Sequence, residues 1–183
     1  MRSKVKNQRA PLTHPQDNIY AKLNGFQIIW YHFLKDGYDN PMIDDVYNEK
    51  ILGFAGNISR IGKLDAPDAS ARAHSKLCGS TVKVDLVMHD KVVSDYAHDV
   101  KACALGQASS AIVAAHIIGT GADELRRVRI EMQKMLKEGG APPQGRFADL
   151  QYLEPVKNHK ARHASTLLVF DAVVDALNQI EAK

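Results

Sequence analysis

Residues 81–100, which read TVKVDLVMHDKVVSDYAHDV, decide the fold of this chain. Apolar and polar side chains alternate from Val82 to Met88, with the two-residue period of a strand that has one buried face. His89-Asp90-Lys91 makes a short hairpin connection, and residues 92–100 return as the next strand. A similar alternation over residues 71–77 predicts a strand before these two. Three antiparallel strands with one apolar face need a helical layer to cover them.

The segments around the strands supply this layer. An amphipathic helix is predicted to open at Met42, and Asp123 is expected to cap a later one, whose Met132 and Met135 are packing residues. The helix that Asp123 caps is predicted at residues 123–137. The remaining helices are predicted at residues 104–118, 147–153 and 161–182. This order indicates an α+β fold, with a small three-stranded antiparallel sheet covered by helices and a long C-terminal helix. We expect one domain at residues 42–183.

Residues 1–41 differ in charge from the rest of the chain. They hold six Lys and Arg against three acidic residues, whereas residues 42–183 hold eighteen of each. A neutral body with mixed charges has no stripe suited to a phosphate backbone, so nucleic acid is not expected as a partner. Residues 1–41 are predicted to be a flexible extension upstream of a biological start at Met42. The alternative is a segment that binds a partner or a membrane surface through Trp30 and its aromatic neighbours.

Composition also indicates the compartment. The longest apolar cluster, residues 26–34, is half of the roughly 18–20 residues that a membrane span needs. It has no small-residue cleavage site in the right place for a signal peptide. Two cysteines are too few for a disulfide-framed secreted domain. We therefore expect a cytoplasmic protein with two free thiols and no membrane partner.

The two cysteines stand at positions that favour chemistry. Cys78 ends the first predicted strand in the tight turn Leu77-Cys78-Gly79-Ser80, and Cys103 stands at the start of a helix. Helix N-termini stabilise negative charge and favour the thiolate, which binds soft metals and attacks sulfur. The alternative is that both are small buried hydrophobic residues. No Cys-x-x-Cys, His-Glu-x-x-His or Gly-x-Ser-x-Gly motif indicates an enzyme.

Three motifs carry a resemblance to a known family. The first is KLCGSTVKVDL at residues 76–86, the second is KACALGQASSA at residues 101–111, and the third is ARHASTLL at residues 161–168. They resemble, in order and interval, the cysteine motifs of the NifU/IscU/SufU-like iron–sulfur cluster assembly scaffold family. Residues 57–62 loosely resemble its early Asn-Pro-x-Asn segment. The likeness spans about residues 44–182.

The resemblance implies a non-enzymatic α+β scaffold that receives iron and sulfur, or binds zinc. A cysteine desulfurase and apo iron–sulfur acceptor proteins are the implied partners. Cys78 and Cys103 match family ligand positions. The family aspartate falls on Ser80 and its third cysteine on Ser165. The histidine that often precedes that cysteine falls on Ala164, with His163 one residue earlier.

These departures leave several functions open. A hydroxyl is un-ionised at neutral pH, and two thiolates cannot fill a four-coordinate iron or zinc site. Two chains could supply four thiolates around one cluster in a symmetric homodimer. Alternatively, His163 could serve as a third ligand to zinc. A second class of function is an interaction module that keeps the fold without binding metal, and a weaker third is a thiol redox protein.

Overall fold

The computed structural model describes residues 46–76 and 78–183. The predicted extension at residues 1–41 lies outside these residues, so the predicted domain division stays a prediction. In chain order the elements are α3 (Glu49–Gly56), β1 (Ala69–His74), β2 (Thr81–His89), β3 (Val92–Lys101), α4 (Ala104–His116), α5 (Ala122–Glu138), the 3₁₀ segment η3 (Gly145–Asn158) and α6 (Lys160–Glu181).

The three strands form one antiparallel sheet in the order β1-β2-β3. Val84 at the centre pairs with Ala71 on β1 and with His98 on β3. The side chains of Val82, Val84 and Leu86 are completely buried, as their alternation predicts. The α+β fold with a three-stranded antiparallel sheet is therefore confirmed.

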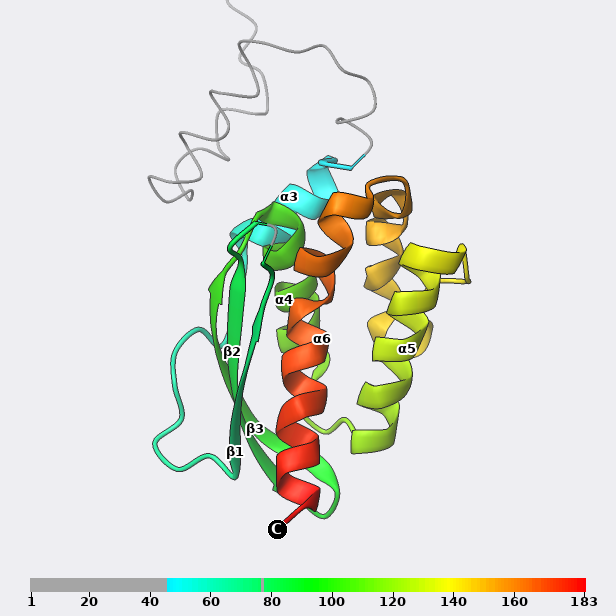
Figure 1. The fold of residues 1–183 in the computed structure, drawn as a ribbon. Helices are drawn as coiled ribbons and strands as arrows, with labels where there is room; N and C mark the ends of the chain where they lie inside the picture. Colours follow the sequence, from blue (N-terminus) through cyan, green and yellow to red (C-terminus); the bar gives the residue numbers. More distant parts are fainter. Residues whose placement is uncertain (1–45, 77) are drawn as a thin grey trace, which may run out of the picture. The chain divides into compact units, whose positions relative to one another are not determined.

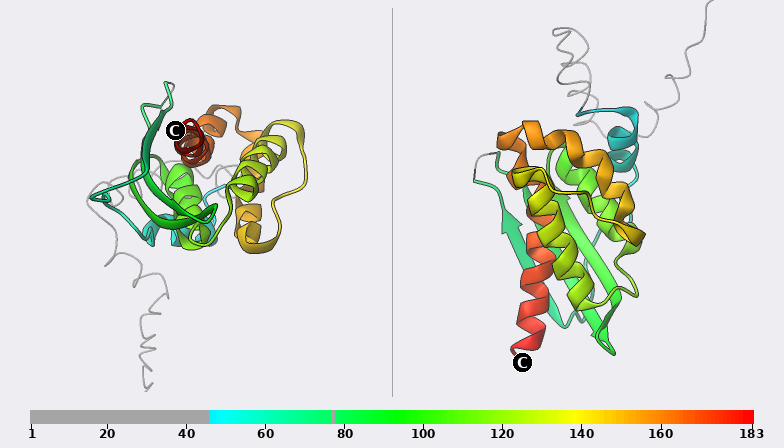
Figure 2. Two further views of the ribbon diagram at one scale, coloured as in Figure 1. Left: turned by 90° about the horizontal axis from the view of Figure 1, so that it is seen from below. Right: turned by 90° about the vertical axis from the view of Figure 1, so that its right-hand side faces the viewer.

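The helices cover one face of the sheet in two layers (Figures 1 and 2). α6 packs against β1 and β2, and α4 packs against β3 and α6. α5 and η3 lie on the far side of α4 and α6 from the sheet. Met132 and Met135 are buried in the core, as expected for packing residues.

Several predicted boundaries differ from the structure. The short helix predicted at residues 147–153 is the longer 3₁₀ segment η3, and the helix predicted at residues 104–118 ends at His116. The helix predicted from Met42 begins at Glu49, because Asn48 caps it by accepting a hydrogen bond from the backbone N–H of Ile51; residues 42–45 are not described. The first strand ends at His74 instead of residue 77.

Asp123 was expected to cap α5. The N-cap is instead Gly121, and Asp123 stands in the first turn, where its charge faces the positive end of the helix dipole. Among the described residues, no helix is both long and apolar enough to span a bilayer.

Candidate thiol site at the end of the sheet

The turn between β1 and β2 presents Cys78. The backbone N–H of Ser75 donates to the carbonyl of Ser80, and that of Gly79 donates to the carbonyl of Ser75, both at 2.9 Å. Gly79 has φ +69°, a left-handed conformation that glycine adopts without strain. This tight turn ends β1 early and leaves Cys78 exposed.

Two serine hydroxyls surround the Cys78 thiol. Its Sγ lies 3.3 Å from Ser75 Oγ and 3.1 Å from Ser80 Oγ. Burial raises the pKa of the Cys78 thiol, but hydrogen bonds from both serines and the charge of Arg162 outweigh burial, so the pKa is lowered. Once the thiol has lost its single proton, both hydroxyls can donate to the thiolate. Ser80 therefore supports the charge on Cys78 in this arrangement.

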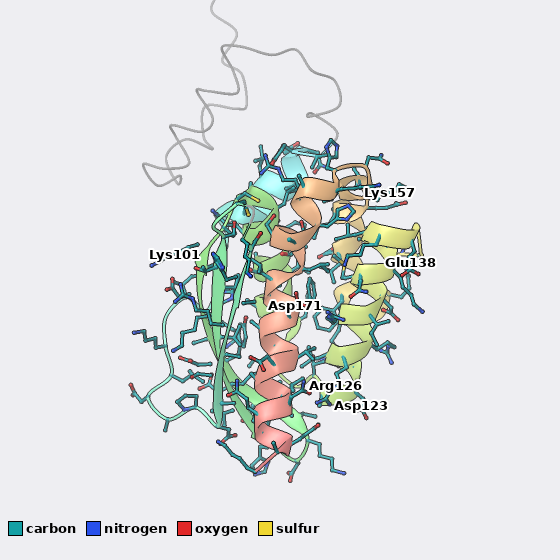
Figure 3. All side chains as sticks on the ribbon, in the orientation of Figure 1. Lys101, Asp123, Arg126, Glu138, Lys157 and Asp171 are labelled. Carbon is teal, nitrogen blue, oxygen red and sulfur yellow. The ribbon has the colours of Figure 1, made fainter. Side chains whose placement is uncertain are left out.

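The register of the sheet brings Cys103 to the same end as Cys78. Thr81, which follows the Cys78 turn, pairs with Lys101 at the end of β3. Lys101 points outward at this end of the sheet, where α6 begins (Figure 3). Cys103 follows as the N-cap of α4 and is half-buried. Two cysteines 25 positions apart in the chain therefore share one end of the sheet.

The first turns of α6 complete the site. Cys103 Sγ lies 3.4 Å from Ser165 Oγ, and the Ser165 hydroxyl donates to the carbonyl of Arg162 at 3.0 Å. With that hydroxyl proton committed, the Cys103 S–H is the donor between the two side chains. A Cys103 thiolate would instead need the Ser165 hydroxyl to turn toward the sulfur.

A glycine sets the spacing between α4 and α6. A Cβ atom at Gly106 would lie 2.9 Å from the backbone oxygen of Ser165 and 2.7 Å from the Cβ of Ala102. Both distances are shorter than van der Waals contact allows. Gly106 therefore permits the close approach that places Ser165 beside Cys103.

Tyr47 joins the site from the segment that precedes α3. Its hydroxyl is buried and has no hydrogen-bond partner within the described part of the chain. Burial and the charge of Cys103 raise the pKa of Tyr47, while the charge of Arg162 opposes them.

His163 does not join the two cysteines. Its Nε2 donates to the carbonyl oxygens of Val156 and Lys157, at 3.1 and 3.2 Å, and the side chain is buried. Over residues 46–76 and 78–183, no three His, Cys, Asp or Glu side chains form a group that could hold a metal ion. The Cys78–Ser80 pair and the Cys103–Ser165 pair thus lie at the same end of the sheet, whereas His163 faces η3.

The fold is that of a known protein family. The family model described as the NifU-like N terminal domain matches residues 46–169. The chain belongs to the NifU-like N-terminal domain family. The crystal structure of the N-terminal part of a nitrogen-fixing NifU-like protein from Brucella abortus is similar to this chain, with 65% sequence identity and a TM-score of 0.77. The match covers 78% of this chain and 99% of the Brucella chain.

Two further proteins are less similar in sequence to this chain. The iron–sulfur cluster assembly scaffold protein IscU of Thermotoga maritima is 27% identical over 135 residues, 74% of this chain and 94% of its own. A proposed SUF-system scaffold protein from Fervidobacterium islandicum is 21% identical, with a TM-score of 0.68, over 73% of this chain and 98% of its own. The second likeness bears on the fold alone.

Sequence analysis of this NifU-like chain missed three contributors to the site. Ser75 fits the alternation of a strand, and nothing in that pattern marks its hydroxyl as a partner of Cys78. Arg162 lies within the third motif, but the motif assigns it no role. Tyr47 carries no local signal, because its position beside Cys103 depends on how α3 packs against α4.

The serine partners of Cys78 should control its reactivity. In a Cys103→Ala background, which leaves Cys78 as the one thiol, we expect Ser80→Ala to raise the pKa of Cys78 because one donor to the thiolate is lost. The reaction rate with iodoacetamide, followed against pH, should then reach its midpoint at a higher pH. Ser94→Ala, which removes an exposed hydroxyl on β3, is the control. An unchanged midpoint in Ser80→Ala would show that Ser80 does not support the thiolate.

Proposed function

We propose that this chain is a non-enzymatic scaffold that assembles or carries an iron–sulfur cluster through the thiolates of Cys78 and Cys103. The observation that supports this proposal most is the placement of both thiols at one end of the sheet. Cys78 is exposed with a lowered pKa, and Cys103 caps α4 beside Ser165. The family relationship and the name of the Thermotoga relative support the same function.

The number of charged ligands favours a cluster shared by two chains. Iron in these clusters is held by thiolates, four for a cluster of two or four irons. One chain brings two, and the hydroxyls of Ser80 and Ser165 are not ionised at neutral pH. Two chains related by a two-fold axis would bring four. The exposure of Cys78 leaves it accessible to a second copy.

Zinc has less support in this geometry. A closed zinc site needs four nitrogen, sulfur or oxygen ligands around one ion. His163, the alternative third ligand to zinc, directs Nε2 to two main-chain carbonyls of η3. We therefore propose iron and sulfide as the cargo. A cysteine desulfurase would supply the sulfur, and apo iron–sulfur proteins would accept the product.

Cys78 is the better placed of the two thiols to accept sulfur. It is exposed, whereas Cys103 is half-buried, and three hydrogen bonds from Ser75 and Ser80 favour its thiolate. Attack on a sulfur atom requires the thiolate and an open approach. The proposed order is therefore attack of the Cys78 thiolate on the outer sulfur of a desulfurase persulfide, which breaks that S–S bond and releases the desulfurase thiolate. Two electrons from an external thiol or ferredoxin-type reductant then convert the Cys78 persulfide to thiolate and sulfide, and iron binds between Cys78 and Cys103.

Anaerobic reconstitution tests the proposal. The full chain is incubated with ferrous iron and sulfide under reducing conditions, desalted, and analysed for iron, sulfide, visible absorption and molecular mass. We expect a cluster that elutes with a dimer. The Cys78→Ala/Cys103→Ala variant, confirmed to be folded by circular dichroism, should retain none.

Two other results would contradict the proposal. If the wild-type chain retains neither iron nor sulfide, the interaction module without metal becomes the better interpretation. If the double variant retains as much as the wild type, the cluster is held elsewhere. If the wild-type chain contains zinc as purified and the Cys78→Ala/Cys103→Ala variant does not, the zinc alternative would be favoured.

A further inference from the structure

The two edges of the sheet differ in their backbone hydrogen bonds. Along β3, the N–H of His98 donates to the carbonyl of Arg60, and the N–H of Gly62 donates to the carbonyl of His98, each at 3.0 Å. Val93, near the other end of β3, bonds in the same way to residues 119–120. β1 forms the opposite edge (Figure 2), and among the described strands it pairs with β2 alone.

The ladder of the sheet identifies the backbone groups along this β1 edge. Because His98 directs its N–H and C=O away from β2, Val84, which lies opposite His98, directs its own groups toward β1. These directions alternate along an antiparallel strand, so the groups of Ser70, Arg72 and His74 point away from β2. No backbone hydrogen bond joins these three residues to a described segment beyond the sheet. Three N–H donors and three C=O acceptors therefore line the edge.

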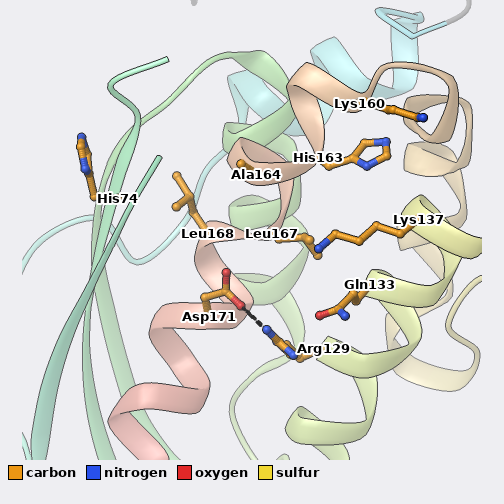
Figure 4. A pocket seen from close by; sticks show the side chains of 10 residues that line it. All are labelled: His74, Arg129, Gln133, Lys137, Lys160, His163, Ala164, Leu167, Leu168 and Asp171. Carbon is orange, nitrogen blue, oxygen red and sulfur yellow. Dashed lines mark hydrogen bonds and ion pairs between the residues drawn. The ribbon is translucent and has the colours of Figure 1, made fainter. Parts of the chain in front are cut away.

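The β1 edge is accessible from solvent. Ser70, Arg72 and His74 are exposed. Next to the end of the strand, a groove of about 520 Å³ is lined by His74, by the start of α6 and by α5 (Figure 4). An extended segment therefore has access to the backbone of β1.

The charge along the β1 edge favours an acidic occupant. Arg72 lies opposite Lys83 on β2, so two like charges face each other, and Lys83 itself pairs with Asp85 at 3.1 Å. Neither Arg72 nor Lys76, in the turn that follows β1, forms an ion pair with a described residue. An acidic side chain opposite Arg72 on an added strand would give Arg72 an attractive cross-strand pair.

A second copy of this chain is a poorer occupant. Two β1 strands that overlap fully about a two-fold axis place Arg72 opposite Arg72, and like charges in such a pair repel. Cys78 follows Arg72 by six positions, so the two Cys78 residues would lie on opposite sides of the axis, roughly 30–40 Å apart. That separation is too large for one shared cluster.

We propose that the β1 edge binds an extended acidic segment of a partner protein as an additional antiparallel strand. The backbone of the segment would bond to Ser70, Arg72 and His74, and an acidic side chain would pair with Arg72. β1 leads into the turn that carries Cys78, so the bound segment would bring its protein to the thiol that accepts sulfur. This link to delivery rests on the proposed function, whereas the binding itself does not.

Hydrogen exchange, followed by NMR on the ¹⁵N-labelled full chain, tests the pairing. The probe is a peptide of about seven residues, long enough to span β1, in which Glu alternates with Thr. In the dilute chain alone, the amides of Ser70, Arg72 and His74 should exchange fast, and those of Ala71 and Ala73 slowly. With peptide at about ten times its dissociation constant, exchange of the first three should slow about tenfold, because it then requires release of the peptide.

Matched controls separate backbone pairing from attraction between charges. Methylation of the Glu nitrogens, which face β1 when Glu lies opposite Arg72, should abolish binding, whereas methylation of the Thr nitrogens should not. Arg72→Glu should weaken binding about fivefold or more, because an attractive pair becomes repulsive. Lys134→Glu makes the same change of charge on an exposed residue of α5, and should change the affinity by less than about twofold.

Each of four results would overturn the inference. The peptide could leave the exchange of Ser70, Arg72 and His74 unchanged, or bind equally well with methylated Glu nitrogens. Slow exchange of these amides in the dilute chain alone would show that the chain itself fills the edge. Slow exchange that appears only at high chain concentration, together with the mass of a dimer, would assign the edge to a second copy.

Reconstitution with iron and sulfide alone separates this outcome from that of the proposed function. Arg72→Glu should hold as much cluster as the wild type, because Arg72 forms no hydrogen bond or ion pair with either cysteine. A chain that binds the peptide but no cluster would leave the edge assignment intact and remove its link to sulfur delivery. A chain that holds cluster but binds no peptide would refute the edge assignment alone.

Discussion

Replacing Ser165 by Cys is expected to increase the affinity of the chain for iron or cluster about tenfold or more, because a third thiolate joins the two already present. Ser165 Oγ lies 3.4 Å from Cys103 Sγ, and the residue is 1% exposed. The new sulfur would therefore lie at the site without a change of fold. Iron and sulfide per chain after anaerobic reconstitution measure the effect.

The control for this variant is Ser94→Cys. Ser94 is an exposed residue near the start of β3, at the opposite end of that strand from Lys101, so this change adds a thiol that has no role in the site. Free thiols are counted before reconstitution, because oxidation between the new thiol and Cys103 would mask a gain. Equal iron in the Ser165→Cys and wild-type chains, with all thiols reduced, would contradict the assignment of Ser165 to the site.

Replacing Ser80 by the family aspartate is expected to act differently from replacing Ser165 by cysteine. Ser80 is 5% exposed and bonds to Cys78 through its hydroxyl. An aspartate there would place a second negative charge beside the Cys78 thiolate, which raises the pKa of that thiol when no metal is bound. Of the two serines at family ligand positions, Ser165 is therefore the one whose replacement tests metal binding most directly.

Gly106→Ala is expected to destabilise the chain by about 1–2 kcal/mol, although alanine favours a helix by about 1 kcal/mol over glycine. The new Cβ would lie 2.9 Å from the backbone oxygen of Ser165, which cannot rotate away. α6 must then shift from α4, so we also expect weaker cluster retention. Urea unfolding and reconstitution measure the two effects.

Gly53→Ala is the matched control. Gly53 lies within α3 and is exposed, and a Cβ atom added there would meet no described atom within 4 Å. The same substitution there should stabilise the chain by about 0.5–1 kcal/mol through helix propensity alone. A stabilised Gly106→Ala variant with unchanged cluster retention would show that the approach of α4 and α6 does not depend on this glycine.

Local patterns predicted most of the fold. The alternation of Val82, Val84 and Leu86 describes a strand buried on one face, because side chains of a strand point to opposite sides. The predicted boundaries are wrong where a few local hydrogen bonds start or end an element. Asn48 starts α3 by capping it, and the Ser75–Ser80 turn ends β1 early. Such competition depends on single hydrogen bonds, which an average over a hydrophobic period does not resolve.

The sequence by itself determined the strands, the helices and the two cysteines at the end of a strand and the start of a helix, because each depends on residues close together in the chain. Only the tertiary structure decided which groups surround those thiols. Tyr47 reaches Cys103 through the packing of α3 against α4, and Ser165 reaches it through the contact of α4 with α6. Ser75 is three residues from Cys78, and the backbone hydrogen bonds of the β1–β2 turn place its hydroxyl beside the thiol. His163 is turned toward η3 by two carbonyl oxygens, although it stands two residues from Ser165. Neighbours along a helix face different directions at 3.6 residues per turn, so proximity in sequence could not place this histidine.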